Sequence, residues 1–591
     1  MSHAHPPITT TPLTQESALA GLQHQKQASY IYMIRGCLLV LVLLFSQQAA
    51  AQDIESLKTA KPFSINGSIG LSSTFYTANG IENRQTPFTY GINANLNLSL
   101  YGVLQLPFSF VWYNQQQASY NYPSFNRYGI SPKYKWITVH LGHRSMRLSE
   151  YTLNGYAFLG AGVELTPGKF RFAAMYGKFN QNSDVDPYMA DSIPQYTRRG
   201  WAVKAGYGTP QRFIDVSVLR IGDDTKNYVQ PTNPEAPTPA QNLAVGLTSN
   251  FAITPKLLFA FDGSISLYTK NIKDPIQVMV EGQGMDFLQK LITINLTSTY
   301  YTAFKTSLVY KVSRQLGFGL EYRRIDPEYQ SLGAYFSNND LEMYSFNANA
   351  ALWKNKLVLN GSLGVQRDNL GNTKKATSRR TVGSLSGSLN MTQSLGVDFN
   401  YSNFSTNQRA GRSPLIDSLR LFQVNHNISV MPRFTKVTAA NSHFVMLSLN
   451  RMQLDDKNKK TATQSETATT MLSANYMLGF LKSGTSLSLG LNYTTLENNV
   501  YKGKMYGGSL GAAQTLLKNK LSLNWTNSFT LNNVDENDSK TLTSYLSVNY
   551  RPHPRHSLNL GVNYISNSYS NTEQTPSYNE TRGEFRYGYS F

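Results

Sequence analysis

Apolar and polar residues alternate with a period of two along most of the chain, from about Phe63 onward. In residues 487–493, Leu and Tyr occupy the odd positions while Ser, Gly and Asn occupy the even ones. The same pattern recurs in 346–352, 357–366 and 397–402. Alternation at 180° per residue is typical of a β-strand whose two faces meet different surroundings, and not of a helix. The pattern therefore predicts an all-β protein.

The connections between these segments fall into a short and a long class that alternate along most of the chain. The short connections are 166–168, 209–211, 254–256, 313–315, 354–356 and 518–520. The long connections include 181–197, 223–240, 269–298, 327–341, 368–379 and 406–419. Transmembrane barrels have short periplasmic turns and longer outer loops, whereas soluble sandwiches show no such rhythm. Residues 63–591 are therefore predicted to form a transmembrane antiparallel up-and-down β-barrel.

Counting the alternating segments between these connections, from Phe63 to Phe591, gives about 26 strands, within a range of roughly 24 to 28. An even number is expected because it leaves both ends of a bacterial single-chain barrel in the periplasm. Lipid offers no hydrogen-bond partner to a free sheet edge, so the last strand is expected to pair with the first.

The last strand places Phe585, Tyr587, Tyr589 and Phe591 on one face. This ending resembles that of bacterial outer-membrane proteins, whose terminal strand carries alternating aromatic residues and a C-terminal Phe. The resemblance implies that the four residues are a membrane-assembly signal read by the barrel-assembly machinery, and that the protein lies in the cell outer membrane. A plain amphipathic strand is the alternative, but it predicts no terminal Phe.

Composition agrees with a barrel and excludes other classes. Aromatic residues make up 12% of the 591 residues and charged residues 15%, where a soluble domain has about 25% charged residues. A mean hydropathy of −0.34 argues against a helical membrane protein, and the aromatic content argues against disorder. Tyr and Trp near predicted strand ends are expected in membrane-interface belts; they are Tyr76, Trp112, Tyr134, Trp136, Tyr207, Tyr268, Trp353 and Tyr550.

The net charge of +19 indicates anionic partners. Basic residues cluster at both predicted rims, so outer-membrane lipid and lipopolysaccharide are the expected partners. Nucleic acid is not expected, because an exported barrel does not present a basic patch interleaved with base-stacking groups in a reachable compartment.

The N-terminus has the pattern of an export signal. Arg35 precedes an apolar segment, 36–45, and an Ala-rich site that predicts cleavage after Ala51. Residues 1–51 are therefore interpreted as a signal peptide with a polar N-terminal extension, in which Met33 is the expected true start. Residues 52–62 would form a short periplasmic leader.

The predicted inward face is rich in Asn, Ser, Thr and Gly, with few charges, so a ring of this size would leave a wide lumen unless something fills it. The predicted lumen charges are Lys204, Asp262, Glu321, Arg323 and Asp398. Within the loop 269–298, a short helix would carry Met285, Phe287, Leu288 and Leu291. This helix would either fold into the mouth and constrict the pore or cap the rim.

No catalytic, cofactor-binding or metal-binding constellation is predicted, and the protein is not expected to be an enzyme. His140 and His143 lie close to Ser145 in the sequence, but a strand points the two rings to opposite faces. A barrel-embedded lipid hydrolase therefore remains only a minor alternative.

Several stretches resemble a family of large, mostly uncharacterised outer-membrane β-barrel proteins of Bacteroidetes-type bacteria. The residues that carry the resemblance are 126–132, 141–144, 160–168, 325–335, 339–342 and 364–370. The resemblance implies compartment and architecture but transfers no site. The leading hypothesis is a channel, or the membrane subunit of an export or surface-display assembly with an unidentified protein partner. The alternative is a structural or docking barrel closed by its loops.

Overall fold

The computed structural model describes residues 61–114, 127–180, 196–226, 237–278, 285–334, 339–410, 420–534, 537–570 and 576–591. The chain divides into two units, Met1–Pro62 and Phe63–Phe591, of which the second is described below. The signal peptide predicted at 1–51 and most of the predicted leader 52–62 lie outside the described residues.

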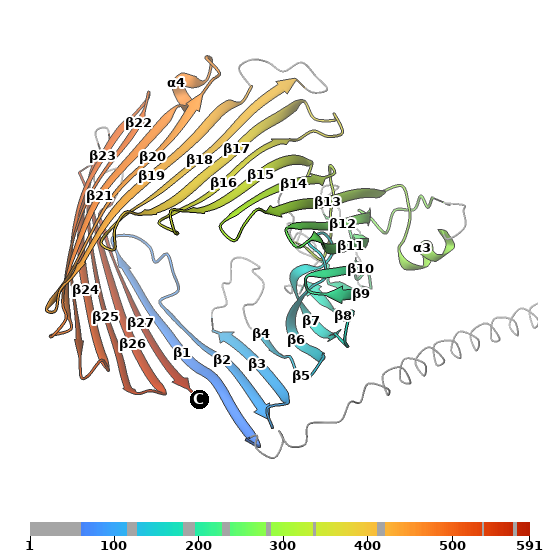
Figure 1. Ribbon diagram of the computed structural model, residues 1–591, viewed down its shortest axis with the longest axis horizontal. Coiled ribbons are helices and arrows are strands. Elements are labelled where there is room, and N and C mark those ends of the chain that lie inside the picture. Colours follow the sequence, from blue (N-terminus) through green and yellow to red (C-terminus); the bar gives the residue numbers. More distant parts are fainter. Residues whose placement is uncertain are drawn as a thin grey trace, which may run out of the picture. The chain divides into compact units, whose positions relative to one another are not determined.

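The second unit is built almost wholly of strands (Figure 1). The first strands are β1 (Phe63–Asn79), β2 (Phe88–Leu100), β3 (Leu104–Tyr113), β4 (Arg127–Ile130), β5 (Lys133–Tyr134), β6 (Ile137–Arg147), β7 (Asn154–Leu165), β8 (Phe170–Asn180), β9 (Arg198–Thr209), β10 (Arg212–Asp223), β11 (Gln241–Thr254), β12 (Leu257–Thr269), β13 (Ser298–Lys311) and β14 (Leu316–Ile325). The remaining strands are β15 (Leu341–Leu352), β16 (Leu357–Arg367), β17 (Ala376–Asn390), β18 (Leu395–Ala410), β19 (Phe422–Val437), β20 (Asn441–Asp456), β21 (Thr467–Phe480), β22 (Thr485–Asn498), β23 (Lys502–Leu516), β24 (Leu521–Val534), β25 (Asn537–His553), β26 (His556–Tyr569) and β27 (Tyr578–Ser590).

Antiparallel pairing of neighbours closes these strands into one ring. The last strand, β27, pairs with β1 over Ser68↔Ser590 to Asn79↔Asn579, as predicted. The 27 strands occupy 26 positions in the wall, because β4 and β5 together fill one position between β3 and β6. The break between them falls at Ser131 and Pro132, and a proline cannot donate a ladder hydrogen bond. The prediction of a closed antiparallel barrel of about 26 strands is confirmed.

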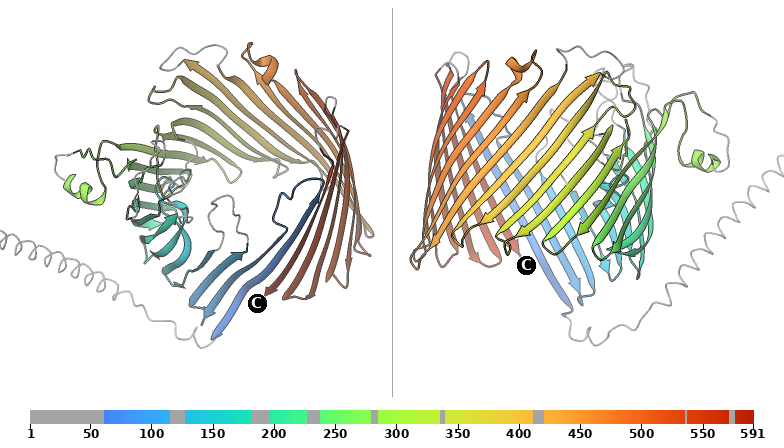
Figure 2. Two further views of the ribbon diagram at one scale, coloured as in Figure 1. Left: turned by 180° about the vertical axis from the view of Figure 1, so that it is seen from behind. Right: turned by 45° about the horizontal axis from the view of Figure 1, so that its top comes forward.

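The two ends of the barrel differ as the sequence predicts. Each predicted short connection joins two strands at one end, and Figure 2 shows these turns at the lower end of its right-hand view. At the turn 353–356, Trp353, Lys354 and Asn355 all have positive φ, between 51° and 66°. The long connections lie at the other end. The alternation fails at two places there, because β22 is followed by β23 at Lys502 and β24 by β25 at Asn537.

Apolar side chains form the outward face. Leu363, Leu491 and Tyr207 remain more than half exposed, which is the surface that a lipid-facing wall requires. Two residues expected in the aromatic belts differ. Tyr76 is only 6% exposed and its hydroxyl donates to Glu580 Oε1 at 2.8 Å, while Tyr268 shares the inward face with Asp262. Whether these two rings face the lipid or the interior depends on how their strands pair with other strands. A position near a predicted strand end does not show this.

Buried apolar side chains are confined to one side of the ring. Among the described residues, all of them except Tyr76 and Ala94 lie between Met146 and Leu341. Most of them form two clusters inside β6–β15, one around Leu153 and Leu219 and one around Tyr151 and Tyr329. We call this side, β6–β15, the packed side. The remainder, β16–β27 with β1–β3, is called the open side.

Two described helices lie in the loops, α3 (Met285–Leu291) and α4 (Ala462–Ser465). Neither is both long and apolar enough to cross a membrane.

Candidate functional site

Residues 148–153, between β6 and β7, lie inside the packed side; we call them the inner segment. The segment closes on itself, since the Leu148 amide donates to the Leu153 carbonyl at 2.8 Å. Tyr151, Thr152 and Leu153 are fully buried. Leu153 packs with inward-facing side chains of β7–β11, including Leu219 and Ile221. The connection therefore fills interior space instead of extending from the rim.

Charged groups hold the inner segment against β12–β14. Glu150 accepts from Lys305 Nζ at 2.6 Å and from Arg323 Nη2 at 2.8 Å. Asp262 accepts from the Ser149 hydroxyl at 2.6 Å and from the Glu150 amide at 2.9 Å. Asp262, Lys305 and Arg323 are directly opposed across the three strands, so pairing register alone brings them together. Hydrogen bonds to ionised groups are among the stronger contacts a loop can make.

A second connection, 326–334 after β14, covers the inner segment. The Tyr329 hydroxyl donates to the Tyr151 carbonyl, and the Ser331 hydroxyl donates to the Thr152 carbonyl, both at 2.6 Å. The rings of Tyr151 and Tyr329 meet edge to face, with centroids 6.2 Å apart. Burial raises the pKa of both phenols, so Tyr329 stays protonated and remains a donor at neutral pH.

Gly333 in this second connection allows close contact. A Cβ atom there would lie 2.8 Å from Leu219 Cδ2 and 2.9 Å from the Thr152 carbonyl oxygen. Its own carbonyl accepts from the Asn154 amide at 3.0 Å. A side chain at this position would separate the second connection from the inner segment.

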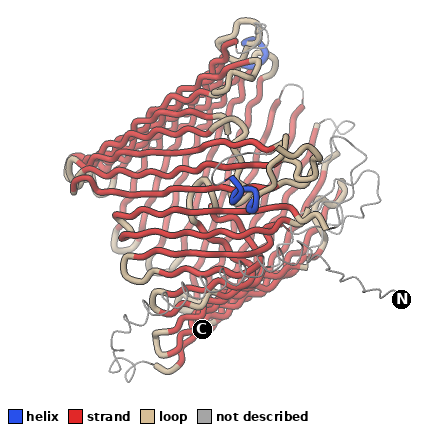
Figure 3. The backbone as a smooth tube through the Cα atoms, turned by 90° about the vertical axis from the view of Figure 1, so that its right-hand side faces the viewer, coloured by secondary structure: helices blue, strands red, loops and turns tan. Residues whose placement is uncertain are grey.

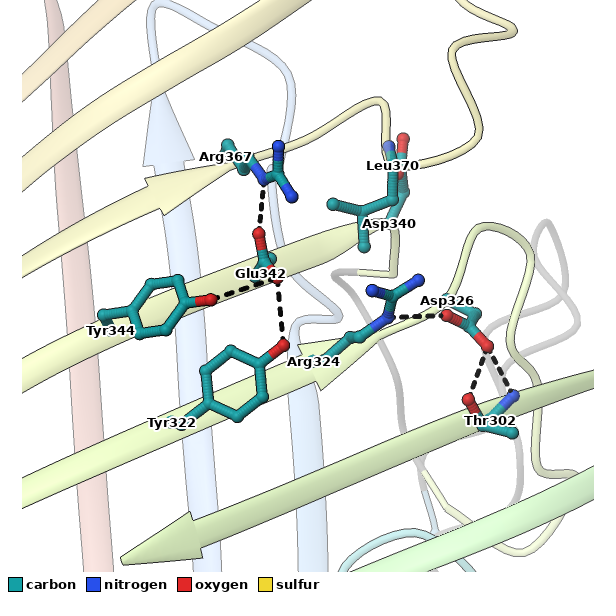
Figure 4. Close-up of polar contacts among 9 residues, drawn as sticks. All are labelled: Thr302, Tyr322, Arg324, Asp326, Asp340, Glu342, Tyr344, Arg367 and Leu370. Atoms are coloured by element: carbon teal, nitrogen blue, oxygen red, sulfur yellow. Dashed lines mark hydrogen bonds and ion pairs between the residues drawn. The ribbon is translucent and has the colours of Figure 1, made fainter.

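Polar contacts at the long-loop end attach neighbouring strands and loops to one another (Figure 4). Glu342 on β15 accepts from the Tyr322 hydroxyl at 2.9 Å and pairs with Arg367 on β16. Asp326 accepts from the Thr302 amide at 2.9 Å and pairs with Arg324 at 3.1 Å.

Asp340 joins the loop 326–340 to the loop 368–375. Its carboxylate accepts from the amides of Asn369 at 2.9 Å and Leu370 at 2.8 Å and pairs with Lys374. Burial by itself would raise the pKa of Asp340, but Lys374 and the two amides outweigh it and lower the pKa below its ordinary value. The carboxylate is therefore ionised at neutral pH.

The inward face of the open side is uncharged over wide areas. Directly opposed residues form a polar row across six strands: Asn349, Asn360, Ser386, Asn400, Ser429 and Asn450. All are exposed or half-buried, although they point into a closed ring. The interior beside them is therefore accessible to solvent.

All five residues predicted as lumen charges lie on the inward face of their strands. Lys204 Nζ lies 3.7 Å from Asp215, which also pairs with Arg171 at 2.8 Å. Asp398 pairs with Arg433 on the neighbouring strand β19. Glu321 lies two residues before Arg323 on the same face of β14. Asp262 and Arg323 hold the inner segment.

Sequence reasoning missed other inward charges. Glu150, Lys305 and Asp215 were not singled out, and neither were Glu580, Arg582, Glu584 and Arg586 on β27. The signal for the β27 charges was present, because they alternate with the aromatic residues of the C-terminal pattern. No comparable signal marked Glu150, which lies in a connection.

The predicted helix in the loop 269–298 is present as α3, and it lies outside the ring of strands (Figure 3). Arg220 Nε donates to the Leu291 carbonyl at 2.8 Å, and Phe287 is 65% exposed while Leu288 is half-buried. In this placement α3 does not lie in the mouth of the barrel, where the constricting alternative would put it. The Met285 side chain lies outside the described residues.

The aromatic residues of the C-terminal strand point outward. Phe585 and Tyr587 lie opposite Ser73 and Leu71 of β1. The Tyr589 and Phe591 rings meet edge to face with centroids 4.9 Å apart, and the Phe591 amide donates to the Gly67 carbonyl at 3.0 Å. These contacts seal the junction between the first and last strands.

A serine, a histidine and a glutamate lie next to one another on the inward face. Ser131 Oγ is 3.0 Å from His140 Nδ1, and His140 Nε2 is 3.7 Å from Glu164. The second distance exceeds hydrogen-bond range, so Glu164 does not orient the ring as a catalytic partner would. His143 points to the opposite face, against the Tyr128 ring. Within the described ranges, no group of three or more His, Cys, Asp or Glu residues could hold a metal ion.

No family model matches the chain, and no curated protein matches it. Several solved structures are similar. The structure of Pseudomonas aeruginosa OpdK with vanillate has 11% identity and a TM-score of 0.30, covering 64% of this chain and 98% of that chain. The translocation pore of the P pilus usher PapC has 11% identity and a TM-score of 0.32, covering 89% and 99%. Acinetobacter baumannii OccAB4 has 11% identity and a TM-score of 0.28, covering 64% and 97%. These similarities concern the barrel fold alone.

Proposed function

We propose that the protein is an outer-membrane channel whose lumen is narrowed on the packed side. One observation carries this proposal: a closed ring with an apolar outward face has inward polar residues that stay accessible on the open side. An apolar exterior suits lipid, and a polar, accessible interior suits water and hydrophilic solutes.

The inward face of the open side is uncharged over wide areas, which favours polar cargo without strong charge selection. Rows of Asn and Ser offer hydrogen bonds of modest strength, and weak binding allows a solute to leave as well as enter. A polypeptide handed over by a partner protein is also a cargo of this kind, so the export-subunit hypothesis is retained as a form of the same proposal.

Conductance in planar bilayers tests the proposal. The purified full chain is expected to form discrete single channels that remain open at low voltage. A protein that inserts, shows heat-modifiable gel migration and carries no current would contradict the channel and favour the alternative of a structural barrel closed by its own loops. Recovery of the protein as a soluble periplasmic species would overturn the membrane placement itself.

A docking barrel is the second candidate, and the inner segment is the observation that favours it. Residues 148–153 and 326–334 already fill one side, so a partner would need to occupy only the open side to close the lumen. Such a protein would conduct when purified and stop conducting when its partner is added.

A further inference from the structure

An apolar groove of about 860 Å³ lies on the outward face of β19–β24. Its side chains come from two neighbouring rows of directly opposed residues. The first row is Leu449, Leu472, Tyr493, Tyr506 and Leu531, and the second is Leu447, Ala474, Leu491, Gly508 and Phe529. Ala474 and Gly508 form the hollow, since no other atom lies within 4 Å of the position that a Gly508 Cβ would take.

A polar row borders the groove on its long-loop side. Arg451, Thr470, Thr495, Lys504 and Asn533 are directly opposed across β20–β24. Arg451 and Lys504 are both exposed, and they share a face with the groove because each lies two residues from a groove side chain. Three strand spacings separate them, or about 14 Å. A third exposed cation, Lys540 on β25, lies opposite Leu531.

Within β20–β24 this bordering row holds no carboxylate, and on β25 it continues to the exposed Asp538, opposite Asn533. The next row toward the long-loop end has one, Glu497, directly opposite Lys502. The second outward groove, of about 470 Å³ over β13–β16, differs in this respect. There the cations beside the groove are neutralised, because Arg367 pairs with Glu342 and Arg324 pairs with Asp326.

The rim is low above β22–β25, whereas the connection 457–466 with α4 lies above β20 and β21. The connections from β22 to β23 and from β24 to β25 are the two that break the long-loop rhythm. A bulky headgroup can therefore lie over Lys504 and Lys540 without meeting a long loop.

We propose that this groove binds a phosphorylated, multiply acylated glycolipid of the lipid A type. The acyl chains would occupy the apolar rows, and phosphates would pair with Arg451, Lys504 and Lys540. Charge complementarity favours this occupant over a protein, since apolar rows and cations at one end match an amphiphile with anionic groups at one end. The inference rests on the proposed membrane placement and does not require the barrel to conduct.

Binding of purified diphosphorylated lipid A to the full chain in zwitterionic detergent, followed by native mass spectrometry, tests the proposal. The double variant R451E/K504E is expected to lose at least about tenfold in affinity, because two charge-assisted contacts become repulsive. Gly508→Trp, which fills the hollow without a backbone clash, is expected to lose about fivefold. Dephosphorylated lipid A is expected to bind as weakly to the wild type as the phosphorylated lipid binds to the double variant.

Matched substitutions on the outward face of the packed side serve as controls. Lys178→Glu on β8 and Ala161→Trp on β7 are expected to leave binding unchanged. Equal binding by R451E/K504E and the wild type, or equal losses in the controls, would overturn the proposed site. So would a Gly508→Trp variant that keeps lipid A but loses a co-purifying protein or a second copy. Fractionation of each variant separates these outcomes from failure of the membrane placement.

Discussion

The packed and open sides of the barrel use the same strand pattern for different purposes. On both sides, apolar residues face outward, but the inward face of the packed side also carries large apolar side chains such as Phe158, Leu219 and Ile221. On the packed side, inward positions such as Ala202, Leu219 and Ala244 are fully buried beneath the inner segment. On the open side, the inward Asn349 and Asn400 remain exposed. The comparison shows that inward apolar side chains of the wall form a core where the inner segment packs against them, whereas inward Asn and Ser side chains line a lumen.

Replacing the inner segment should have the largest effect on the difference between the packed and open sides. With 148–153 exchanged for a Gly-Ser linker of equal length, the packed side loses its filling and the lumen widens. Single-channel conductance is expected to rise at least about twofold. The matched control replaces the α4-containing connection 457–466 on the open side in the same way, and its conductance should stay within error of the wild type. Equal conductance in all three proteins would show that the segment does not narrow the pore.

A single buried side chain of the inner segment tests the same point through stability. Leu153→Ala leaves a cavity in a fully buried cluster and is expected to lower the free energy of unfolding by about 3 kcal/mol. Urea unfolding in lipid vesicles, followed by gel migration, measures the change. Leu489→Ala on the outward face of the open side, where the side chain is 44% exposed, is the control and should cost less than half as much. Similar losses at both positions would mean that the packed side has no core of its own.

The charge that anchors the inner segment tests its electrostatic role. Glu150→Gln removes the carboxylate that faces both Lys305 and Arg323, so the lumen gains one net positive charge at that point. The ratio of anion to cation permeability, from reversal potentials in a salt gradient, is expected to rise on the order of twofold. Adding salt should diminish the shift through screening. Asp398→Asn, which removes a carboxylate on the open side, offers the comparison, and a larger effect there would contradict a lumen narrowed at Glu150.

The alternation and the turn residues made the barrel predictable, but not what lies inside it. Local patterns determine strands, short turns and the face that a residue such as His143 takes within its own strand. The neighbours of Asp262 depend on pairing register, which brings Lys305 and Arg323 beside it from two other strands. The inner segment has the length of an ordinary connection, and nothing in its composition separates burial inside the ring from exposure at the rim. Tyr76 shows the same limit, since its partner Glu580 lies at the other end of the chain.

The loop contact at Asp340 is expected to give the smallest effect, and it tests whether the packed side is held at its rim as well as in its interior. Folding lowers the pKa of this carboxyl from an ordinary value of 3.8. A lowered folded-state pKa stabilises the protein at pH values above the ordinary one, and the stabilisation is lost as the pH falls through the folded-state value. The contact should therefore persist at pH 5–7 and weaken only below about pH 4.

Cleavage by a lysine-specific protease reports on this contact, because Lys374 is the residue that Asp340 holds. Asp340→Asn is expected to expose the loop 368–375 and to speed cleavage about fivefold at neutral pH, as the loss of roughly 1 kcal/mol implies. Asp224→Asn, an outer-loop substitution whose carboxylate accepts from the Lys226 amide, should change nothing at this site. If the wild type and Asp340→Asn were cleaved at equal rates, the rim contact would add no order, and the packed side would depend on its interior alone.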